Sequence, residues 1–153
     1  MVLKGKYFKV LAAVCWIMVF CCVSSGFAAE QHFVVIVNNG NNIIGISANE
    51  LKLIYLGKKK MWASGDKITI WLPPSQSAEM RFLLLEILKF KDETDLKKHY
   101  LSAIFEQKMT VIPSAVHNAE DAARKVARYK GGMALVNASD VRGYAGIKIL
   151  DIN

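Results

Sequence analysis

The side chains with the clearest chemical potential are three consecutive lysines, Lys58 to Lys60, which directly follow Gly57. A run of ammonium groups could attract an anion. The same run also suits the end of a helix, because cations near the last carbonyls gain about 0.3–1 kcal/mol each from the helix dipole. Charge runs are usually solvated surface. We therefore expect a helix terminus and a turn at this point, with an anion-binding basic patch as the alternative.

The remaining reactive residue types do not form a recognisable catalytic or metal-binding pattern. His32, His99 and His117 are scattered, with no pair spaced by four residues, so we predict no metal site. No serine lies in Gly-x-Ser-x-Gly. The glycine-rich residues 129–133 lack the Lys-Ser/Thr pair of a phosphate-binding loop. The sequence therefore gives no indication of an enzyme or of a cofactor.

The first 28 residues have the features of an export signal. MVLKGKYFKV carries three lysines and no acid, and the next thirteen residues, LAAVCWIMVFCCV, are all apolar. Small residues then follow, with Gly26 and Ala28 at the positions that a signal peptidase requires. The apolar run is shorter than the roughly 20 residues needed to span a bilayer. We therefore predict a signal peptide over 1–28, cleavage after Ala28, and a periplasmic domain over 29–153.

Removal of this segment changes the properties of the chain that folds. Cys15, Cys21 and Cys22 all lie within the signal, so the mature chain has no cysteine for a disulfide or a metal. Its formal charge falls from +7 to about +4, a surplus that does not indicate a nucleic-acid partner. About 125 residues remain, which is enough for one domain with one core.

The pattern of apolar residues predicts alternating strands and helices. The continuous apolar run at 33–37 predicts a strand buried on both faces. Ser47 and Glu50 have the spacing of a capping box, so a helix should begin at Ala48 and end at Gly57. We expect its inward residues to be Leu51, Ile54 and Tyr55.

The rest of the chain continues this alternation. We predict further strands at 67–72, 133–137 and 147–150 and further helices at 76–90, 93–105 and 119–129. The inward residues of the last two helices should be Leu96, Tyr100, Ile104 and Phe105, and Ala122, Val126 and Ala127. This order indicates an α/β sandwich whose sheet is at least partly parallel and carries helices on both faces.

Three stretches of the chain also share the pattern of a known family. Residues 47–58 read SANELKLIYLGK, Trp62 is followed by the turn Gly65-Asp66-Lys67-Ile68, and residues 131–136 read GGMALV. These stretches resemble the solute-binding proteins of phosphate ABC transporters, in which a helix ends in Ile-Phe-x-Gly-Lys. The resemblance implies a single lobe of the type II periplasmic-binding-protein fold, with a mixed, mostly parallel sheet.

The resemblance also implies a position for a binding site. In that family a cleft between two lobes binds an oxyanion through hydroxyls, an arginine and N–H groups at helix N-termini. The corresponding segment here, 71–81, contains Ser75, Gln76, Ser77 and Arg81 as the implied anion-binding residues. It has no Ser-Gly-Thr and no arginine before the turn, and Pro73-Pro74 leads into it. The alternative is that the serines only cap a helix and that Arg81 is a solvated surface residue.

Two functions follow from this resemblance. The first is an exported solute-binding domain that binds inorganic phosphate or another oxyanion and works with an ABC transporter permease. Because the mature chain is about half the length of family members, a second copy or a partner would have to supply the other wall of the cleft. The alternative function is a ligand-free interaction or assembly protein of the cell envelope, built on the same lobe. A homodimer is compatible with both functions.

Overall fold

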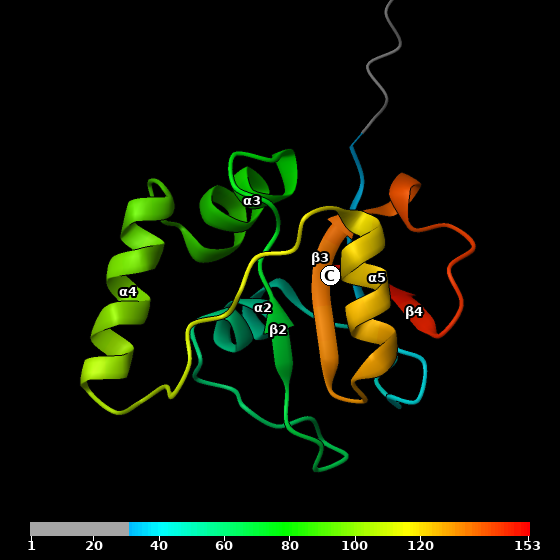
Figure 1. The fold of residues 1–153 in the computed structure, drawn as a ribbon, viewed down its shortest axis with the longest axis horizontal. Coiled ribbons are helices and arrows are strands. Elements are labelled where there is room, and N and C mark those ends of the chain that lie inside the picture. The colour runs from blue at the N-terminus through cyan, green and yellow to red at the C-terminus, as the bar shows by residue number, and fades with distance from the viewer. Residues whose placement is uncertain (1–30) are drawn as a thin grey trace, which may run out of the picture. The chain divides into compact units, whose positions relative to one another are not determined.

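A mixed four-stranded sheet forms the centre of the domain. The computed structural model describes residues 31–153, so the predicted signal segment and its cleavage site lie outside the described residues. The strands are β1 (Phe33–Asn38), β2 (Thr69–Trp71), β3 (Gly132–Asn137) and β4 (Ile147–Leu150). Their order across the sheet is β2-β3-β1-β4 (Figure 1).

Only one of the three strand pairs is parallel. β2 pairs with β3 in parallel, whereas β1 is antiparallel to both β3 and β4. A mixed sheet with helices on both faces is confirmed, but the expected predominance of parallel pairing is wrong. The apolar run of β1 indicated burial on both faces, and helices on both faces bury a strand whatever its direction.

The two faces of the sheet carry separate apolar cores. Alternate residues of a strand point to opposite faces. Val35 and Val37 therefore face the larger core together with helix α2 (Ala48–Tyr55), and Val34 and Ile36 face the smaller core under helix α5 (Ala119–Arg128). The larger core also includes α3 (Ala78–Phe82), its continuation η1 (Leu83–Leu88) and α4 (Glu93–Phe105). Figure 1 shows α5 in front of β3 and α4 at a distance from the strands.

The lysine run is a helix terminus, as expected. Ser47 Oγ accepts the N–H of Glu50 at 3.1 Å and caps α2, and Gly57 leaves the helix with φ 72°. The backbone N–H groups of Lys58 and Lys59 donate to the carbonyl of Leu53. The Glu50 carboxylate pairs with the Lys59 ammonium, so the capping box lacks its expected second half.

Three helices differ in detail from the prediction. The predicted helix 76–90 begins at Ala78, becomes π-helical from Leu83 and closes at Lys89 in a left-handed conformation. In α4 the inward residues are Leu96, Tyr100 and Ala103, spaced by four and three, so Ile104 is only half-buried and Phe105, at the last turn, is 91% exposed. In α5 the buried alanines are Ala122 and Ala123, and Ala127 is half-buried.

Strand β2 is shorter at both ends than the predicted strand 67–72. Lys67 forms a bridge with Met61 in the turn that precedes the strand, and Leu72 forms a bridge with Ala115. Within residues 31–153 no helix combines the length and the apolar character needed to cross a membrane.

Candidate functional site

The candidate site lies at the carboxyl ends of the parallel strands β2 and β3. The N–H of Leu72 donates to the carbonyl of Ser114 at 3.0 Å, and the N–H of Val116 donates to the carbonyl of Leu72 at 2.9 Å. These bonds hold the chain leaving β2 beside the chain entering α5. Ligand sites of α/β sheets commonly lie at this edge, where strands give way to helices. The turn 73–77, which contains three of the four predicted site residues, lies at this edge.

Ser77 caps helix α3. Its Oγ accepts the N–H of Met80 at 3.0 Å, and its backbone is extended. The cap that the alternative interpretation expects is therefore present at this serine. A hydroxyl has one donor and two acceptor positions, so the cap leaves the O–H of Ser77 free to donate.

Ser75 and Gln76 contact a carboxylate of the chain itself. Ser75 Oγ donates to Glu93 Oε2 at 2.7 Å, and the backbone N–H of Gln76 donates to Glu93 Oε1 at 2.8 Å. Gln76 adopts a left-handed backbone conformation with φ 61°, which is costly for a residue other than glycine. Glu93 is the first residue of α4, so this contact joins the turn after β2 to the start of a distant helix. Two of the predicted anion donors thus already hold two oxygens of one oxyanion.

Sequence reasoning missed Glu93. The pattern of apolar residues predicted only that a helix begins at this residue. The contact spans 18 residues and a helix that turns the chain, and no local pattern signals such a pairing.

Arg81 does not join this cluster. Its backbone N–H continues the helix to the carbonyl of Ser77, and its residue is exposed. Among residues 31–153 its guanidinium contacts none of Ser75, Gln76 and Glu93. The structure therefore brings Ser75, Gln76 and Ser77 together in one turn, while Arg81 lies on the exposed face of α3.

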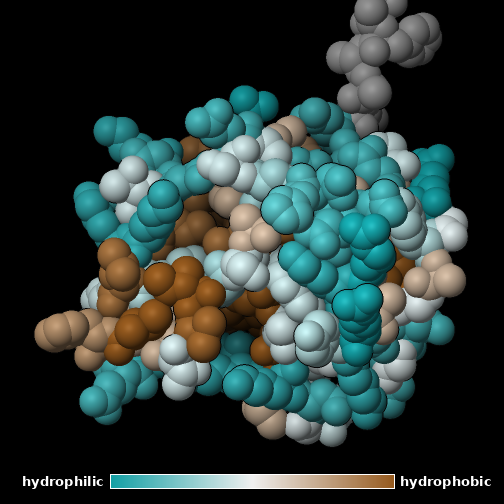
Figure 2. Space-filling view, viewed as in Figure 1, coloured by the Kyte–Doolittle hydropathy of each residue, from teal (hydrophilic) through white to brown (hydrophobic). Residues whose placement is uncertain are grey.

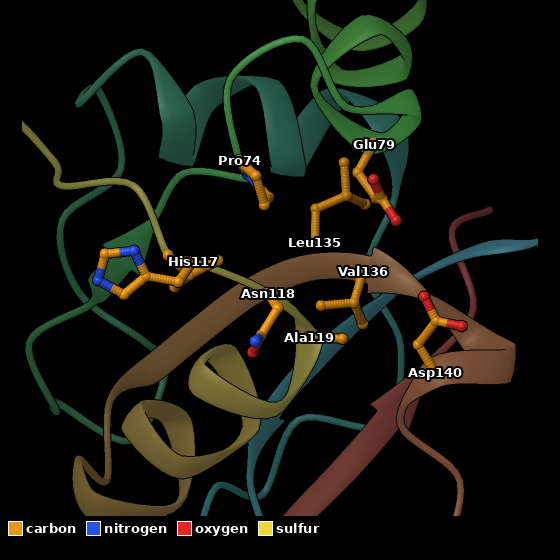
Figure 3. Close-up of a pocket in the computed structure, with 9 residues that line it drawn as sticks. Pro74, Glu79, His117, Asn118, Ala119, Leu135, Val136 and Asp140 are labelled. Carbon is orange, nitrogen blue, oxygen red and sulfur yellow. The ribbon is translucent and has the colours of Figure 1, made fainter.

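A small pocket of about 180 Å³ lies beside this turn. Leu135 and Val136 of β3 form its base, and Pro74 and the start of α5 form its walls (Figure 3). Figure 3 shows Glu79 and Asp140 on one side of this base and the imidazole of His117 on the other, pointing away from it. The pocket therefore presents carboxylates rather than cations beside the candidate donors.

The start of α5 is fixed by its own capping residues. Asn118 Oδ1 accepts the N–H of Asp121 at 2.8 Å, and Asp121 Oδ2 accepts the N–H of His117 at 3.1 Å. The backbone N–H of His117 and, to a smaller extent, the ammonium of Lys125 hold the pKa of the Asp121 carboxyl below its usual range. The wall formed by His117 and Asn118 is thus held in place by hydrogen bonds.

The site brings hydrogen-bond donors of one turn together on a carboxylate. Within the described residues no group of three or more His, Cys, Asp or Glu side chains could hold a metal ion. The donors are one hydroxyl and one N–H that already bind a carboxylate, with a second hydroxyl at the helix start.

Comparisons with known proteins bear on the fold of this chain. No family model matches the sequence, and a search of curated proteins finds no match. Solved structures do match. PstS from Borrelia burgdorferi matches with a TM-score of 0.61 and 16% identity, over 80% of this chain and 47% of that one.

Two further structures give the same result. A putative phosphate ABC transporter substrate-binding protein with bound phosphate from Clostridium perfringens has a TM-score of 0.58 and 16% identity, over 80% of this chain and 44% of that one. An ABC-type phosphate transport receptor from Vibrio cholerae has a TM-score of 0.61 and 12% identity, over 80% of this chain and 46% of that one. The chain has the fold of phosphate-binding proteins. It spans less than half of their length, and at this level of identity the similarity establishes the fold alone.

Proposed function

We propose that this protein is an exported solute-binding domain that binds a small oxyanion, with phosphate as the first candidate, at Ser75, Gln76 and Ser77. The observation that carries the proposal is the convergence of Ser75 Oγ and the Gln76 N–H on the two oxygens of one carboxylate. A carboxylate and a phosphate both present neighbouring oxygens to such donors. The hydroxyl of Ser77 adds a third donor at the same turn.

Glu93 is then a competitor that an external anion must displace. Hydrogen bonds to a charged group contribute about 1.5–3 kcal/mol each, less where water is close. Ser75 is exposed, so its bond to Glu93 lies in the weaker part of that range. Rotation of the Glu93 side chain would free both donors without a change in the backbone. The anion would then occupy the position of the carboxylate.

Two further features support the proposal. The matched structures include one described with bound phosphate, and the candidate turn lies where α/β sheets commonly bind ligands. The start of the chain favours export to the periplasm, where an ABC transporter permease would be the functional partner. Because the donors lie at an exposed turn, a second copy of the chain or a partner would supply the opposite wall.

Isothermal titration with sodium phosphate and sodium sulfate tests this proposal. We expect weak saturable binding by the unchanged protein, binding at least tenfold tighter in Glu93→Ala, and loss of binding when Ser75→Ala is added to it. Glu106→Ala is the matched control, because that carboxylate also accepts from a serine and a lysine but lies away from the turn. No binding by the Glu93→Ala protein would refute the proposal.

Specific observations also favour the second candidate, a ligand-free interaction protein of the envelope. The carboxylates of Glu79 and Asp140 line the pocket next to the candidate turn and would disfavour an anion there. Helix α4 also exposes two large apolar residues: Leu101 is 60% exposed and Phe105 is 91% exposed. Exposed apolar groups of this kind are typical of protein interfaces. Sedimentation equilibrium tests the homodimer form: we expect a dimer that Phe105→Asp dissociates, and a monomer at all concentrations would contradict it.

A further inference from the structure

The outer edge of β2 has an unpaired stretch of backbone. On its inner side the strand pairs with β3, beginning with the N–H of Thr69 and the carbonyl of Gly131 at 3.0 Å. On its outer side the N–H of Ile68 donates to Lys60 and the N–H of Leu72 donates to Ser114. The backbone of Ile70, between these two points, faces outward and has no partner among the described residues. A sheet edge of this kind is a template for another strand.

A groove lies along this unpaired stretch. The segment that follows α4 runs beside β2, and the two are joined by the parallel bridge between Leu72 and Ala115. Away from that bridge they diverge and enclose a groove of about 410 Å³, which we call the β2 groove. Its walls are residues 68–70 and 107–113, and Ile54 and Gly57 also line it. Figure 2 shows apolar residues gathered around a hollow beside this segment.

The walls of the β2 groove carry accessible apolar side chains. Val111 is 71% exposed and Ile112 is 41% exposed, although both are large aliphatic residues. Ile70 and Met109 lie partly buried beside them against the larger core. Accessible apolar surface in a concave site favours a bound partner, because burial removes it from water.

The rim of the groove is basic. Lys59, Lys60, Lys67 and Lys108 all line it, and no acidic residue does. Lys59 pairs with Glu50 and Lys108 pairs with Glu106, whereas Lys67 forms no ion pair within residues 31–153. The groove therefore has a positive surplus that complements acidic side chains.

We propose that the β2 groove binds an extended segment of a partner protein, which adds as a strand to β2 and carries acidic residues between apolar ones. The backbone of the segment would pair with Ile70. Because side chains of a strand alternate, one set would enter the groove and the other would face the lysines. The stretch bounded by the bonded N–H groups of Ile68 and Leu72 extends about 13 Å at roughly 3.3 Å per residue, so at most four residues of the partner would lie along it. The inference gives the second proposed function a surface and does not depend on anion binding.

Defined peptides test the chemistry of the occupant. The probe is a fluorescent seven-residue peptide in which glutamate and valine alternate, measured by anisotropy at low salt. One control peptide has lysine in place of glutamate, and another has proline in place of the central valine. We expect the glutamate peptide to bind at least tenfold tighter than either control and to shift the backbone amide resonance of Ile70. Equal binding of the lysine peptide, or no binding of the glutamate peptide, would overturn the proposal.

Variants locate the binding surface. Ile112→Asp and Lys67→Glu should each weaken binding of the glutamate peptide at least fivefold. Their matched controls are Ile44→Asp, at an apolar residue 97% exposed outside the groove, and Lys98→Glu on α4. Circular dichroism confirms that each variant is folded.

Two results would overturn the assignment while leaving other proposals intact. If peptide binding survives Ile112→Asp, the β2 groove is not the site, although an interaction function remains. If the protein forms a dimer that Ile112→Asp abolishes and the peptide competes for, the occupant is a second copy of the chain. Neither result affects the anion titration, because the two sites share no lining residue.

Discussion

Glu93 Oε2 lies 2.7 Å from Ser75 Oγ, and this contact connects the turn after β2 to the first residue of α4. The same carboxylate accepts the N–H of Gln76, a residue with a left-handed backbone. Glu93 thus fills the hydrogen-bonding capacity that a bound oxyanion would use. The two proposed functions differ in whether this internal carboxylate yields to an external ligand or remains permanently in place.

The two serines of the site should have different effects on stability. Ser77→Ala removes the cap of α3, and loss of a cap costs about 1 kcal/mol of the free energy of unfolding. Ser75→Ala removes an exposed hydroxyl from a carboxylate that keeps its bond to Gln76, so we expect a loss of less than about 0.5 kcal/mol. Urea denaturation measures both values. An equal loss in the two variants would contradict the separate roles of the serines.

Gly57→Ala should destabilise the domain for two separable reasons. The residue has φ 72°, and a left-handed backbone costs a residue with Cβ about 1–2 kcal/mol. An added Cβ would also lie 2.7 Å from Sδ of Met109. Gly65→Ala is the matched control, because its φ is 87° but no atom lies within 4 Å of the added Cβ.

Urea denaturation of the unchanged protein, Gly57→Ala, Gly65→Ala, Met109→Ala and the double variant of Gly57 and Met109 separates the backbone cost from the clash. We expect Gly57→Ala to cost more than Gly65→Ala, and Met109→Ala to reduce the additional cost in the double variant. Equal costs at the two glycines would show that Met109 moves aside without penalty.

Local patterns predicted most elements of this fold, and non-local contacts explain the differences. The spacing of Ser47 and Glu50 and the position of Gly57 determined the bounds of α2, since capping depends on neighbouring residues. The direction of β1 depends on which strands lie beside it, and its apolar run does not contain that information. The length of α4 was predicted correctly, but Phe105 is exposed because α4 contacts the rest of the domain along only one face.

The candidate site was predictable only in part. The turn with Ser75, Gln76 and Ser77 was predicted from a family resemblance, and in the structure it follows β2. The contact of Glu93 with that turn depends on how η1 reverses the chain. The lysine run was correctly interpreted as the end of a helix, but its place on the rim of a groove depends on the path of residues 107–113.

Two buried tyrosine hydroxyls should limit stability at high pH. Tyr100 donates to the carbonyl of Tyr55 at 2.9 Å, and Tyr55 donates to the carbonyl of Trp71 at 3.2 Å. Burial raises the pKa of both phenols above the usual value of about 10. Below about pH 10 both phenols are protonated in the folded and in the unfolded chain, so their contribution to stability is fully present. As the pH rises above about 10, the unfolded chain ionises first, so the free energy of unfolding should fall.

Tyr100→Phe tests this interpretation of the tyrosine pair. It removes one donor and leaves the carbonyl of Tyr55 without it, so we expect a loss of about 1 kcal/mol at neutral pH. The decline of stability above pH 10 should also become shallower, because one raised pKa is gone. Tyr144→Phe, at an exposed tyrosine, is the matched control. An unchanged slope in Tyr100→Phe would contradict the assignment.

Asp121 should control stability at the acid end of the pH range. The N–H of His117 and the ammonium of Lys125 lower the pKa of this carboxyl in the folded state. Its stabilising effect is therefore present above its pKa in the unfolded chain, about 3.9, and is lost as the pH falls through its pKa in the folded chain. Asp121→Asn should flatten the fall in stability below about pH 4, measured by urea denaturation at a series of pH values. Asp140→Asn is the control, because it removes a carboxylate that is bonded to its neighbour Ser139. In this variant the fall in stability below about pH 4 should stay steeper than in Asp121→Asn. If the two variants behave alike, the N–H of His117 does not stabilise the Asp121 carboxylate, and the wall of the pocket formed by His117 and Asn118 is not anchored in this way.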